Sequence, residues 1–414
     1  MISEKRIALL HAGRYQPERI DEYIALGGYD PVKKALKKNP VDIIDLLIDA
    51  KLRGRGGAGF PTGLKNKFTN ESVCQRCVQK YIICNADEGE PGTFKDRVIM
   101  EQNPHVLIEG MIIAAYAIGA SKGYIYIRGE YTKSIQRLQI ALRQAEEKGF
   151  LGNNIFDSGF DLSLELKLGA GSYLCGEELT LLESLEGKRG YPRIKPPFPA
   201  EKGLFQKPTL INNVETFAHL SYIIEKGAEH YRSLGTENSP GTKIFTISGD
   251  VNQPGYYETT MGVTLRQLID DLAGGMKHHK TFKAALLGGA AGTLVDETVL
   301  DTPMGFDTLK QKGAVLGSGA IVVMAEERSV FEMIYSILDF FKHESCGKCV
   351  PCRIGTAQLM LLMDQANENP EKKGEILDQL LSEADYMAKN SLCPLGQSPI
   401  LPIKSVKQYF QHQF

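Results

Sequence analysis

The chain has 414 residues, of which 43% are hydrophobic and 24% charged, so it is long enough for two or three domains and has an ordinary globular composition. Its 48 Lys and Arg residues nearly balance its 50 Asp and Glu residues, giving a formal charge of −2, and this balance argues against a nucleic-acid-binding protein. The N-terminus lacks the apolar core of a signal peptide and the longest apolar region, 111–118, is too short to cross a bilayer, so we expect a cytoplasmic protein whose link to a membrane, if it has one, runs through a partner.

The first part of the chain has the pattern of an α/β protein. Residues 1–40 are expected to form a helical lead-in and residues 41–235 to form one domain. Within that domain, apolar runs bounded by turn residues alternate with longer segments of helical period. The pattern predicts strands at 81–84, 124–127 and 162–168, and helices at 103–119 and 132–148. Such alternation predicts a mostly parallel sheet flanked by helices.

The pattern changes near residue 240. Short strands around a Gly/Asn/Pro turn are followed by a short helix and a further strand, which predicts a small α+β domain over 240–326. The expected elements are strands at 243–248, 255–259 and 284–287 and a helix near 264–272. From 328 to 414 only helices are expected. Amphipathic segments at 332–341, 353–365 and 372–387, with one last helix, predict a helical bundle.

A glycine-rich loop, GRGGAGFPTGLK, spans residues 54–65. Such a loop brings backbone N–H groups close to a phosphate, and Arg55 and Lys65 add positive charge. It matches neither the P-loop pattern nor the usual dinucleotide fingerprint, so a flexible surface loop is the alternative. Phe60 and Phe68 are placed either to stack on a planar ring or to pack in the core.

An acidic segment, CNADEGEPGTFKDR, follows the first predicted strand. Ligands of α/β proteins bind beyond the carboxyl ends of strands, which is where Asn85, Asp87, Glu88 and Glu90 are expected. Carboxylates accept hydrogen bonds from ribose or ribityl hydroxyls. A carboxylate at the adenosine ribose also repels a 2′-phosphate, which favours NAD over NADP. A solvated acidic turn is the alternative.

Three more segments have the composition of turns and lie next to predicted strands or helices. GAGSYLCGEE at 169–178 ends a predicted strand and opens a helix, and it is followed by KPPFPA at 195–200 and PTLINNVET at 208–216. Asn212 and Asn213 precede a helix, so they either cap it or contact a ligand.

The C-terminal cysteines give the strongest single signal. Cys346, Cys349 and Cys352 stand at three-residue spacing, and Cys393 follows in a distant turn. Four thiolates in this three-plus-one arrangement suit one [4Fe-4S] cluster. Structural zinc sites usually divide four cysteines into two close pairs, so zinc is the less favoured alternative, with buried free cysteines behind it.

Together with SCGKCVPCR at 345–353, these motifs resemble, in content and order, the NADH-binding flavoprotein subunit of respiratory complex I. The flavin subunits of NAD-reducing hydrogenases and NAD-linked formate dehydrogenases share the signature. The resemblance runs from about residue 20 to the C-terminus. It implies a Rossmann-like flavin domain, a ubiquitin-like (SLBB-type) β-grasp domain and a C-terminal four-helix bundle that carries the cluster.

The resemblance also assigns ligands to residues. It implies FMN contacts at Gly54, Arg55, Gly56, Lys65, Asn85, Asp87, Tyr173, Gly176, Glu177, Asn212, Asn213 and Thr216. It implies NADH contacts at the aromatic residues Phe60, Phe68 and Phe198 and at the acidic residues Glu88, Glu90 and Glu178. It implies cluster ligation by Cys346, Cys349, Cys352 and Cys393.

Two features depart from the family pattern. Asn66 stands where the family often has Trp, which affects one packing contact. Cys74 and Cys77 form an additional CxxC pair, which we interpret first as incidental and otherwise as a redox pair or half of a zinc site.

The implied reaction is hydride transfer from NADH to FMN, followed by one-electron transfer to the cluster. The cofactors carry this chemistry without a side-chain acid or base. Because one cluster cannot dispose of the electrons, partners are implied, namely a thioredoxin-fold [2Fe-2S] subunit and a larger multi-cluster iron-sulfur subunit.

The expected parent assembly is a complex I-like NADH:quinone oxidoreductase. A soluble NAD-dependent [FeFe]-hydrogenase, including an electron-bifurcating one, or a formate dehydrogenase is the alternative. A cluster-binding scaffold that has lost its flavin is an alternative of another class, but the glycine-rich loop and the NADEGE motif are intact.

Overall fold

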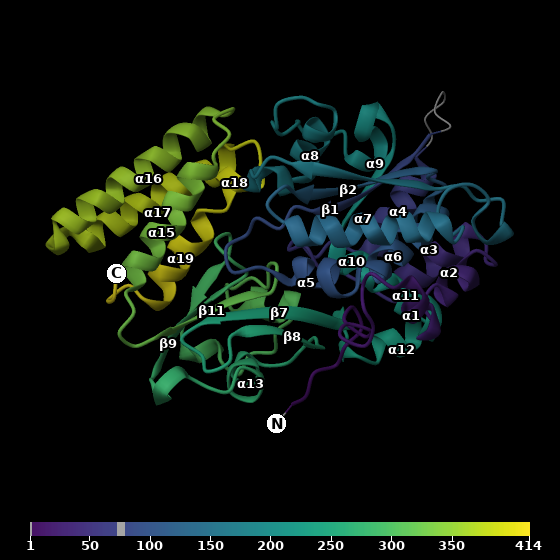
Figure 1. Ribbon diagram of the computed structural model, residues 1–414. Coiled ribbons are helices and arrows are strands. Elements are labelled where there is room, and N and C mark those ends of the chain that lie inside the picture. Colours follow the sequence, from purple (N-terminus) through teal and green to yellow (C-terminus); the bar gives the residue numbers. More distant parts are fainter. Residues whose placement is uncertain (1, 73–78) are drawn as a thin grey trace.

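The computed structural model describes residues 2–72 and 79–414, so the cysteine pair at 74 and 77 lies outside the described residues. Figure 1 shows three parts: an α/β part with one sheet, a smaller part with a second sheet, and a C-terminal group of helices that adjoins both.

The first sheet is parallel throughout, with strand order β3-β2-β1-β4. Its strands are β1 (Tyr81–Ala86), β2 (Lys122–Arg128), β3 (Ser163–Gly169) and β4 (Thr209–Asn213). Ile83 pairs with Tyr124 on one side and with Ile211 on the other, which places the carboxyl ends of β1, β2 and β4 at the same edge. The three predicted strands are confirmed, whereas β4 was expected only as part of a motif.

Helices cover both faces of this sheet, as expected for an α/β domain. Ile82 and Cys84 of β1 belong to one hydrophobic core and Ile83 to another, because successive side chains point to opposite faces. One face is covered by α8 (Glu178–Leu185) and α9 (Pro199–Lys202), and the other by α5 (Lys95–Gln102), α6 (Pro104–Ile118), α7 (Thr132–Glu147) and α10 (Val214–Ala218) (Figure 1). The remaining helices of this part are α3 (Pro40–Asp49), α4 (Thr62–Glu71), α11 (Leu220–Lys226) and α12 (Ala228–Arg232).

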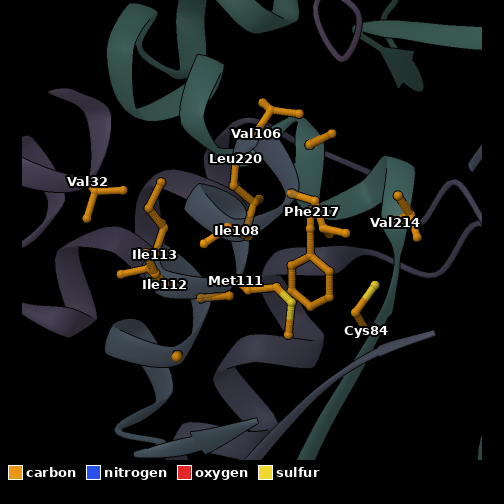
Figure 2. Close-up of a cluster of buried hydrophobic side chains, with 14 of the residues drawn as sticks. Val32, Cys84, Val106, Ile108, Met111, Ile112, Ile113, Val214, Phe217 and Leu220 are labelled. Atoms are coloured by element: carbon orange, nitrogen blue, oxygen red, sulfur yellow. The ribbon is translucent and has the colours of Figure 1, made fainter. Parts of the chain in front are cut away.

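Helix α6 forms the centre of the larger core. All of its residues except Tyr116 are buried, so it lacks a polar face. Figure 2 shows Met111 of α6 and Cys84 of β1 on either side of the Phe217 ring of α10. At Gly110 an added Cβ would lie 2.1 Å from the carbonyl oxygen of Phe217, so only glycine allows this close approach of α6 and α10.

The N-terminal lead-in is less helical than expected. Its helices are two short ones, α1 (Ile20–Ala25) and α2 (Asp30–Ala35), and residues 2–19 form turns and irregular structure. A tertiary contact holds this segment, because the amides of Ile7, Ala8 and Leu9 donate to the buried carboxylate of Glu258, at 2.8, 2.9 and 2.8 Å. A carboxylate that is distant in the sequence therefore fixes the backbone of this segment, which local periodicity could not show.

The second sheet has strand order β10-β9-β11-β7-β8, in which only the β7–β11 pair is parallel. Its strands are β7 (Thr242–Gly249), β8 (Gly255–Thr260), β9 (Phe282–Leu287), β10 (Thr293–Val295) and β11 (Ala320–Ala325). A short hairpin of β5 (Gly235–Thr236) and β6 (Ser239–Pro240) precedes it. Helix α13 (Leu265–Gln267) continues as a π-helical turn over 268–272, and α14 (Phe306–Gln311) follows. The α+β prediction is confirmed, although β10, β11 and α14 were not foreseen.

The C-terminal part is helical, as predicted. Its helices are α15 (Val330–Glu344), α16 (Val350–Glu368), α17 (Lys373–Asn390), the short α18 (Pro394–Gln397) and α19 (Ile400–Tyr409). Leu338, Leu359, Leu380 and Val406 bring the four long helices into one core. Within the described ranges, no helix is long and apolar enough to span a membrane.

Candidate functional site

A cavity of about 960 Å³ lies at the carboxyl edge of the parallel sheet. Asn85 from the end of β1 and Asn213 from the end of β4 both line it. Opposite walls come from residues 313–318 of the second sheet region and from Pro394 and Leu395 of α18. The volume is at the upper end of the range for cofactor pockets. Nine predicted ligand residues line it: Gly56, Asn85, Asp87, Glu88, Glu90, Tyr173, Gly176, Glu177 and Asn213.

The glycine-rich loop turns back on itself beside this cavity. The amide of Gly54 donates to the carbonyl of Phe60 at 2.9 Å, and α4 begins immediately after Pro61. A Cβ at Gly56 would lie 3.0 Å from the Cβ of Asn213, and one at Gly59 would lie 2.5 Å from the ring of Phe306. The loop therefore needs glycine because neighbouring segments press against its backbone.

Arg55 does not present its side chain to the cavity. The side chain is fully buried, and Nη2 donates to the carbonyl of Pro240 at 2.7 Å and to the Tyr231 hydroxyl at 3.3 Å. Its backbone amide donates to Thr216 Oγ1 at 2.9 Å. Arg55 and Thr216 thus anchor the backbone of the loop. The Nε and Nη1 atoms of Arg55 are buried without a partner among the described residues. Whether the guanidinium contributes charge to a phosphate site stays a prediction.

Asp87 places an unpaired carboxylate oxygen at the cavity. Its Oδ2 is buried and has no hydrogen-bond partner among the residues that the structure describes. Burial raises the pKa of Asp87 to about 7, although the Arg128 guanidinium opposes this. Asn85 holds the adjoining chain, because its Nδ2 donates to the carbonyl of Gly176 at 2.8 Å and its Oδ1 accepts from the Asp87 amide at 3.2 Å.

The two glutamates of the acidic segment are engaged with the protein. Glu88 accepts from the amides of Asp96 and Arg97, at 2.8 and 3.0 Å, and so caps the first turn of α5. Glu90 accepts from the Tyr173 hydroxyl at 2.5 Å and from the Ala291 amide at 3.0 Å. Burial raises the pKa of Glu90, and these two hydrogen bonds oppose the rise.

The 173–178 segment ends in two acidic residues with different surroundings. Glu177 caps α8 by accepting from the amides of Leu179 and Thr180. Glu178 contacts the ammonium groups of Lys65 and Lys195, at 3.1 and 2.9 Å. Although burial opposes ionisation, these two lysines lower the pKa of Glu178 to about 2. Lys65 also donates to the carbonyl of Ile211 at 2.7 Å.

The three aromatic residues assigned to NADH stand outside the cavity lining. Phe60, Phe68 and Phe198 are about half exposed, at 49%, 50% and 53%. Phe68 lies on α4 and Phe198 caps α9, and these helices pack against each other. Their exposed faces are available for stacking on a planar ring.

The four C-terminal cysteines lie at one end of the helical part. Cys352 and Cys393 are buried and Cys346 and Cys349 partly buried, and all four pack against the core of the bundle. The Ser345 hydroxyl lies 3.3 Å from Cys352 Sγ. Burial raises the pKa of the Cys393 thiol to about 12, opposed by hydrogen bonds from the amides that follow it. Over the described ranges, no three His, Cys, Asp or Glu side chains are arranged to hold a single metal ion.

Comparison with known proteins assigns these features to a family. The sequence matches the models of the Nuo51 FMN-binding domain over residues 47–222, the SLBB domain over 244–289 and the NADH-ubiquinone oxidoreductase-F iron-sulfur binding region over 332–414. It is 47% identical to the NADH-quinone oxidoreductase F subunit of Aquifex aeolicus, over 94% of this chain and 88% of that protein. The chain belongs to the family of NADH-quinone oxidoreductase F subunits.

Hydrogenase subunits are also similar to this chain. The NADP-reducing hydrogenase subunit HndC of Solidesulfovibrio fructosivorans is 44% identical, over 99% of this chain and 82% of that protein. The crystal structure of an NAD+-reducing [NiFe]-hydrogenase in the H2-reduced state matches with a TM-score of 0.83 and 36% identity. That match covers 99% of this chain, which spans 66% of the hydrogenase chain.

The residues of this member of the F-subunit family fit the two groups that the family models name. Asp87 Oδ2, which lines the cavity, and Asn212 Nδ2, next to the lining residue Asn213, are a buried acceptor and a buried donor without partners among the described residues. A flavin offers both hydroxyl donors and carbonyl acceptors. Gly56 and Gly176 leave backbone open along the cavity. The four thiols fit a [4Fe-4S] cluster, which four cysteines commonly ligate.

Sequence reasoning missed several residues of the site. Lys95 and Asp96 line the cavity, although both belong to the acidic segment that follows the first predicted strand. Arg128 follows the second predicted strand and was available by the same argument about strand ends. Phe306 and residues 313–318 had no local signal, because they come from the part of the chain with the second sheet and reach the site only through tertiary contacts.

Proposed function

We propose that this chain oxidises NADH at an FMN held in the cavity and passes the electrons through its [4Fe-4S] cluster to partner subunits. When bound, FMN supplies the hydride acceptor and the cluster supplies the one-electron carrier. One observation supports this most strongly: Pro394 and Leu395 line the cavity and directly follow Cys393 in the chain. A wall of the cavity and a proposed cluster ligand are thus adjacent in the chain.

The FMN site is proposed at the twelve residues that the family resemblance implies. Asp87 offers its free oxygen to the ribityl hydroxyls, and Asn212 offers its free amide to an acceptor of the ligand. The glycine-rich loop offers backbone N–H groups to the phosphate. Arg55 and Thr216 act by fixing the backbone of that loop.

The NADH site is proposed at the exposed side of the same region. Phe60, Phe68 and Phe198 offer aromatic faces whose burial against adenine is favourable. Glu178 stays ionised between Lys65 and Lys195 and so presents a carboxylate to a ribose. Glu88 and Glu90 are assigned to this site because both line the cavity and their hydrogen bonds hold its neighbouring segments in place.

The cluster ligands are proposed to be Cys346, Cys349, Cys352 and Cys393. The partners are proposed to be a thioredoxin-fold [2Fe-2S] subunit and a larger multi-cluster iron-sulfur subunit, in the cytoplasm or on the cytoplasmic face of a membrane. The proposed division of the chain is a lead-in at 1–40, a flavin domain at 41–235, an SLBB domain at 240–326 and the bundle at 328–414.

Two parent assemblies are supported by relatives. The similarity to the NADH-quinone oxidoreductase F subunit of Aquifex aeolicus favours a complex I-like assembly. The similarity to the hydrogenase subunit of Solidesulfovibrio fructosivorans favours a soluble hydrogenase as the second candidate. The copurifying subunits distinguish the two, because only the first assembly contains membrane subunits.

The decisive experiment is anaerobic purification, followed by visible spectroscopy with NADH and, separately, NADPH. We expect a flavin band over a broad iron-sulfur shoulder that NADH bleaches and NADPH leaves nearly unchanged. Equal bleaching by NADPH contradicts the NAD preference. A colourless protein that contains zinc contradicts both the flavin and the cluster assignments.

A further inference from the structure

Helix α14, from the part of the chain that holds the second sheet, packs against the glycine-rich loop. The Arg53 guanidinium lies 4.2 Å from the ring centroid of Phe306, and an added Cβ at Gly59 would collide with the same ring. The second sheet also contacts the acidic segment, because Thr246 Oγ1 of β7 donates to the carbonyl of Gly92 at 2.7 Å. The loop thus lies between the α/β part, which is the proposed flavin-binding part, and the part that holds the second sheet.

A buried ionic cluster joins these two parts behind the loop. Lys243 of β7 and Glu215 of α10 are both 0% exposed, and Lys243 Nζ lies 3.2 Å from Glu215 Oε2. The same carboxylate oxygen lies 3.0 Å from Nζ of Lys95, which lines the cavity. The other oxygen, Oε1, accepts from the Ile244 amide at 2.8 Å. One flavin-side carboxylate is therefore shared between a cavity residue and the SLBB sheet.

The second contact of Lys243 reaches the loop itself. Its Nζ lies 3.3 Å from the carbonyl oxygen of Arg55. On the other side of that residue, the Arg55 amide donates to Thr216 Oγ1 at 2.9 Å. The backbone of Arg55 is consequently held from both parts at once, one residue before Gly56 enters the cavity.

We propose that Glu215 and Lys243 form an interdomain lock that holds the glycine-rich loop in its flavin-binding conformation, so that the SLBB domain sets part of the affinity for FMN. The proposal rests on the FMN site proposed above. Glu215 and Lys243 are positioning residues, since both act through the backbone of Arg55 and through Lys95.

The physical reason for such a lock is entropic. A glycine-rich loop loses more conformational freedom on ordering than an ordinary segment, and a ligand that must order it binds more weakly. A loop that is already ordered by buried, charge-assisted hydrogen bonds spares the ligand this loss. Removal of either side chain of this pair should be costly, because the other side chain is then left as a buried charge without a partner.

The test compares FMN and riboflavin binding to the deflavinated full-length chain. Lys243→Met keeps the aliphatic stem and removes the ammonium group, and Glu215→Gln keeps the shape and removes the charge. We expect either variant to weaken FMN binding roughly 10- to 100-fold, the range for loss of a charged hydrogen bond. Riboflavin binding should weaken less, because it lacks the phosphate that the loop is proposed to meet.

Glu258→Gln is the matched control. Glu258 is equally buried and lies on β8 beside β7, but it bonds residues 7–9 and Thr242 instead of the loop. We expect its FMN affinity to stay close to that of the parent. An equal loss in this control, or equal losses of FMN and riboflavin in Lys243→Met, would overturn the lock.

Hydrogen exchange of the unaltered protein tests the lock without any variant. Removal of FMN should speed exchange at residues 54–60 and also at the Ile244 amide, which bonds Glu215. An Ile244 amide that does not respond to FMN would overturn the proposal even if both variants failed to fold. If the unaltered chain binds no FMN at all, the proposed function fails instead, which separates the two failures.

Discussion

Replacement of Asp87 by Asn should weaken FMN binding roughly 10- to 100-fold. The structure leaves Asp87 Oδ2 buried and unpaired within the described part of the chain, beside the cavity. A ligand hydroxyl that donates to this oxygen forms a charge-assisted hydrogen bond, whose loss costs about 1.5–3 kcal/mol. That range corresponds to the stated change in the dissociation constant. The amide keeps the shape, so the fold should be unaffected.

The same carboxylate predicts how FMN affinity depends on pH. In the flavin-free protein, burial raises the pKa of Asp87 to about 7, so the group is largely protonated at about pH 6. Hydroxyl donors favour the ionised form, so binding lowers this pKa, and affinity should increase as pH rises from about 6 to 7 and then level off. The limiting change below about pH 7 is about tenfold per pH unit. Arg128 and Glu130 keep their charges over this interval.

The assay is quenching of flavin fluorescence during titration of the deflavinated protein at several pH values on both sides of neutrality. The parent should show the pH dependence, and Asp87→Asn should bind weakly with a clearly smaller slope. The slope that remains belongs to Glu88, which lines the same cavity and whose pKa burial raises to about 7. Tyr173 keeps its proton throughout, because burial raises its pKa well above the usual range of a tyrosine, so it adds no slope. If Asp87→Asn binds as tightly as the parent, or retains the full slope of the parent, then Asp87 is not a flavin ligand and the reasoning fails.

Cys352→Ala should abolish the iron-sulfur absorbance and the EPR signal of the reduced protein while the flavin band persists, and full iron content in this variant would contradict the ligand assignment. Gly110→Ala should lower the free energy of unfolding by about 1–3 kcal/mol, because its Cβ meets the carbonyl of Phe217 and pushes α6 from α10. An unchanged midpoint of urea unfolding would contradict this prediction, because it would show that α6 and α10 move apart without a cost in free energy. Glu258→Gln should cost about 1–3 kcal/mol, because an amide group replaces a carboxylate that accepts from three amides, and proteolysis of residues 2–12 should become faster. Protection equal to that of the parent would contradict the anchoring role.

Local sequence patterns predicted the parts of the site that depend on local structure. Asn85 and Asp87 follow an apolar strand, and ligands of parallel sheets lie beyond the carboxyl ends of strands, so both were expected at the cavity, where they lie. The glycines of the 54–65 loop indicated close approach of backbone, and Gly56 and Gly59 are indeed pressed by Asn213 and Phe306. The amphipathic period likewise placed the C-terminal helices.

The sequence could not show which partner each polar side chain takes. Arg55 was expected to face a phosphate, but it is buried against Pro240, which is 185 positions away. Glu88 lines the cavity as expected, but the sequence did not show that it also caps α5, whose amides it meets eight and nine positions later. A charged residue in a loop can bind a ligand, a backbone carbonyl or a helix end equally well, and only the tertiary packing decides which of these partners it meets.

The placement of Tyr173 shows why the site needs all three parts of the chain. Its side chain lines the cavity and its hydroxyl donates to Glu90, whose other oxygen accepts from Ala291 beyond β9. Its backbone amide donates at 3.0 Å to Glu344, at the end of α15. The next residue, Ser345, places its hydroxyl 3.3 Å from Cys352 Sγ. Tyr173 is therefore linked through Glu90 to a residue that follows β9, and directly to the helix that leads into the cysteine loop. Since electron transfer between two cofactors depends on their separation, the contacts that hold these parts together also set the distance from the cavity to the cysteines.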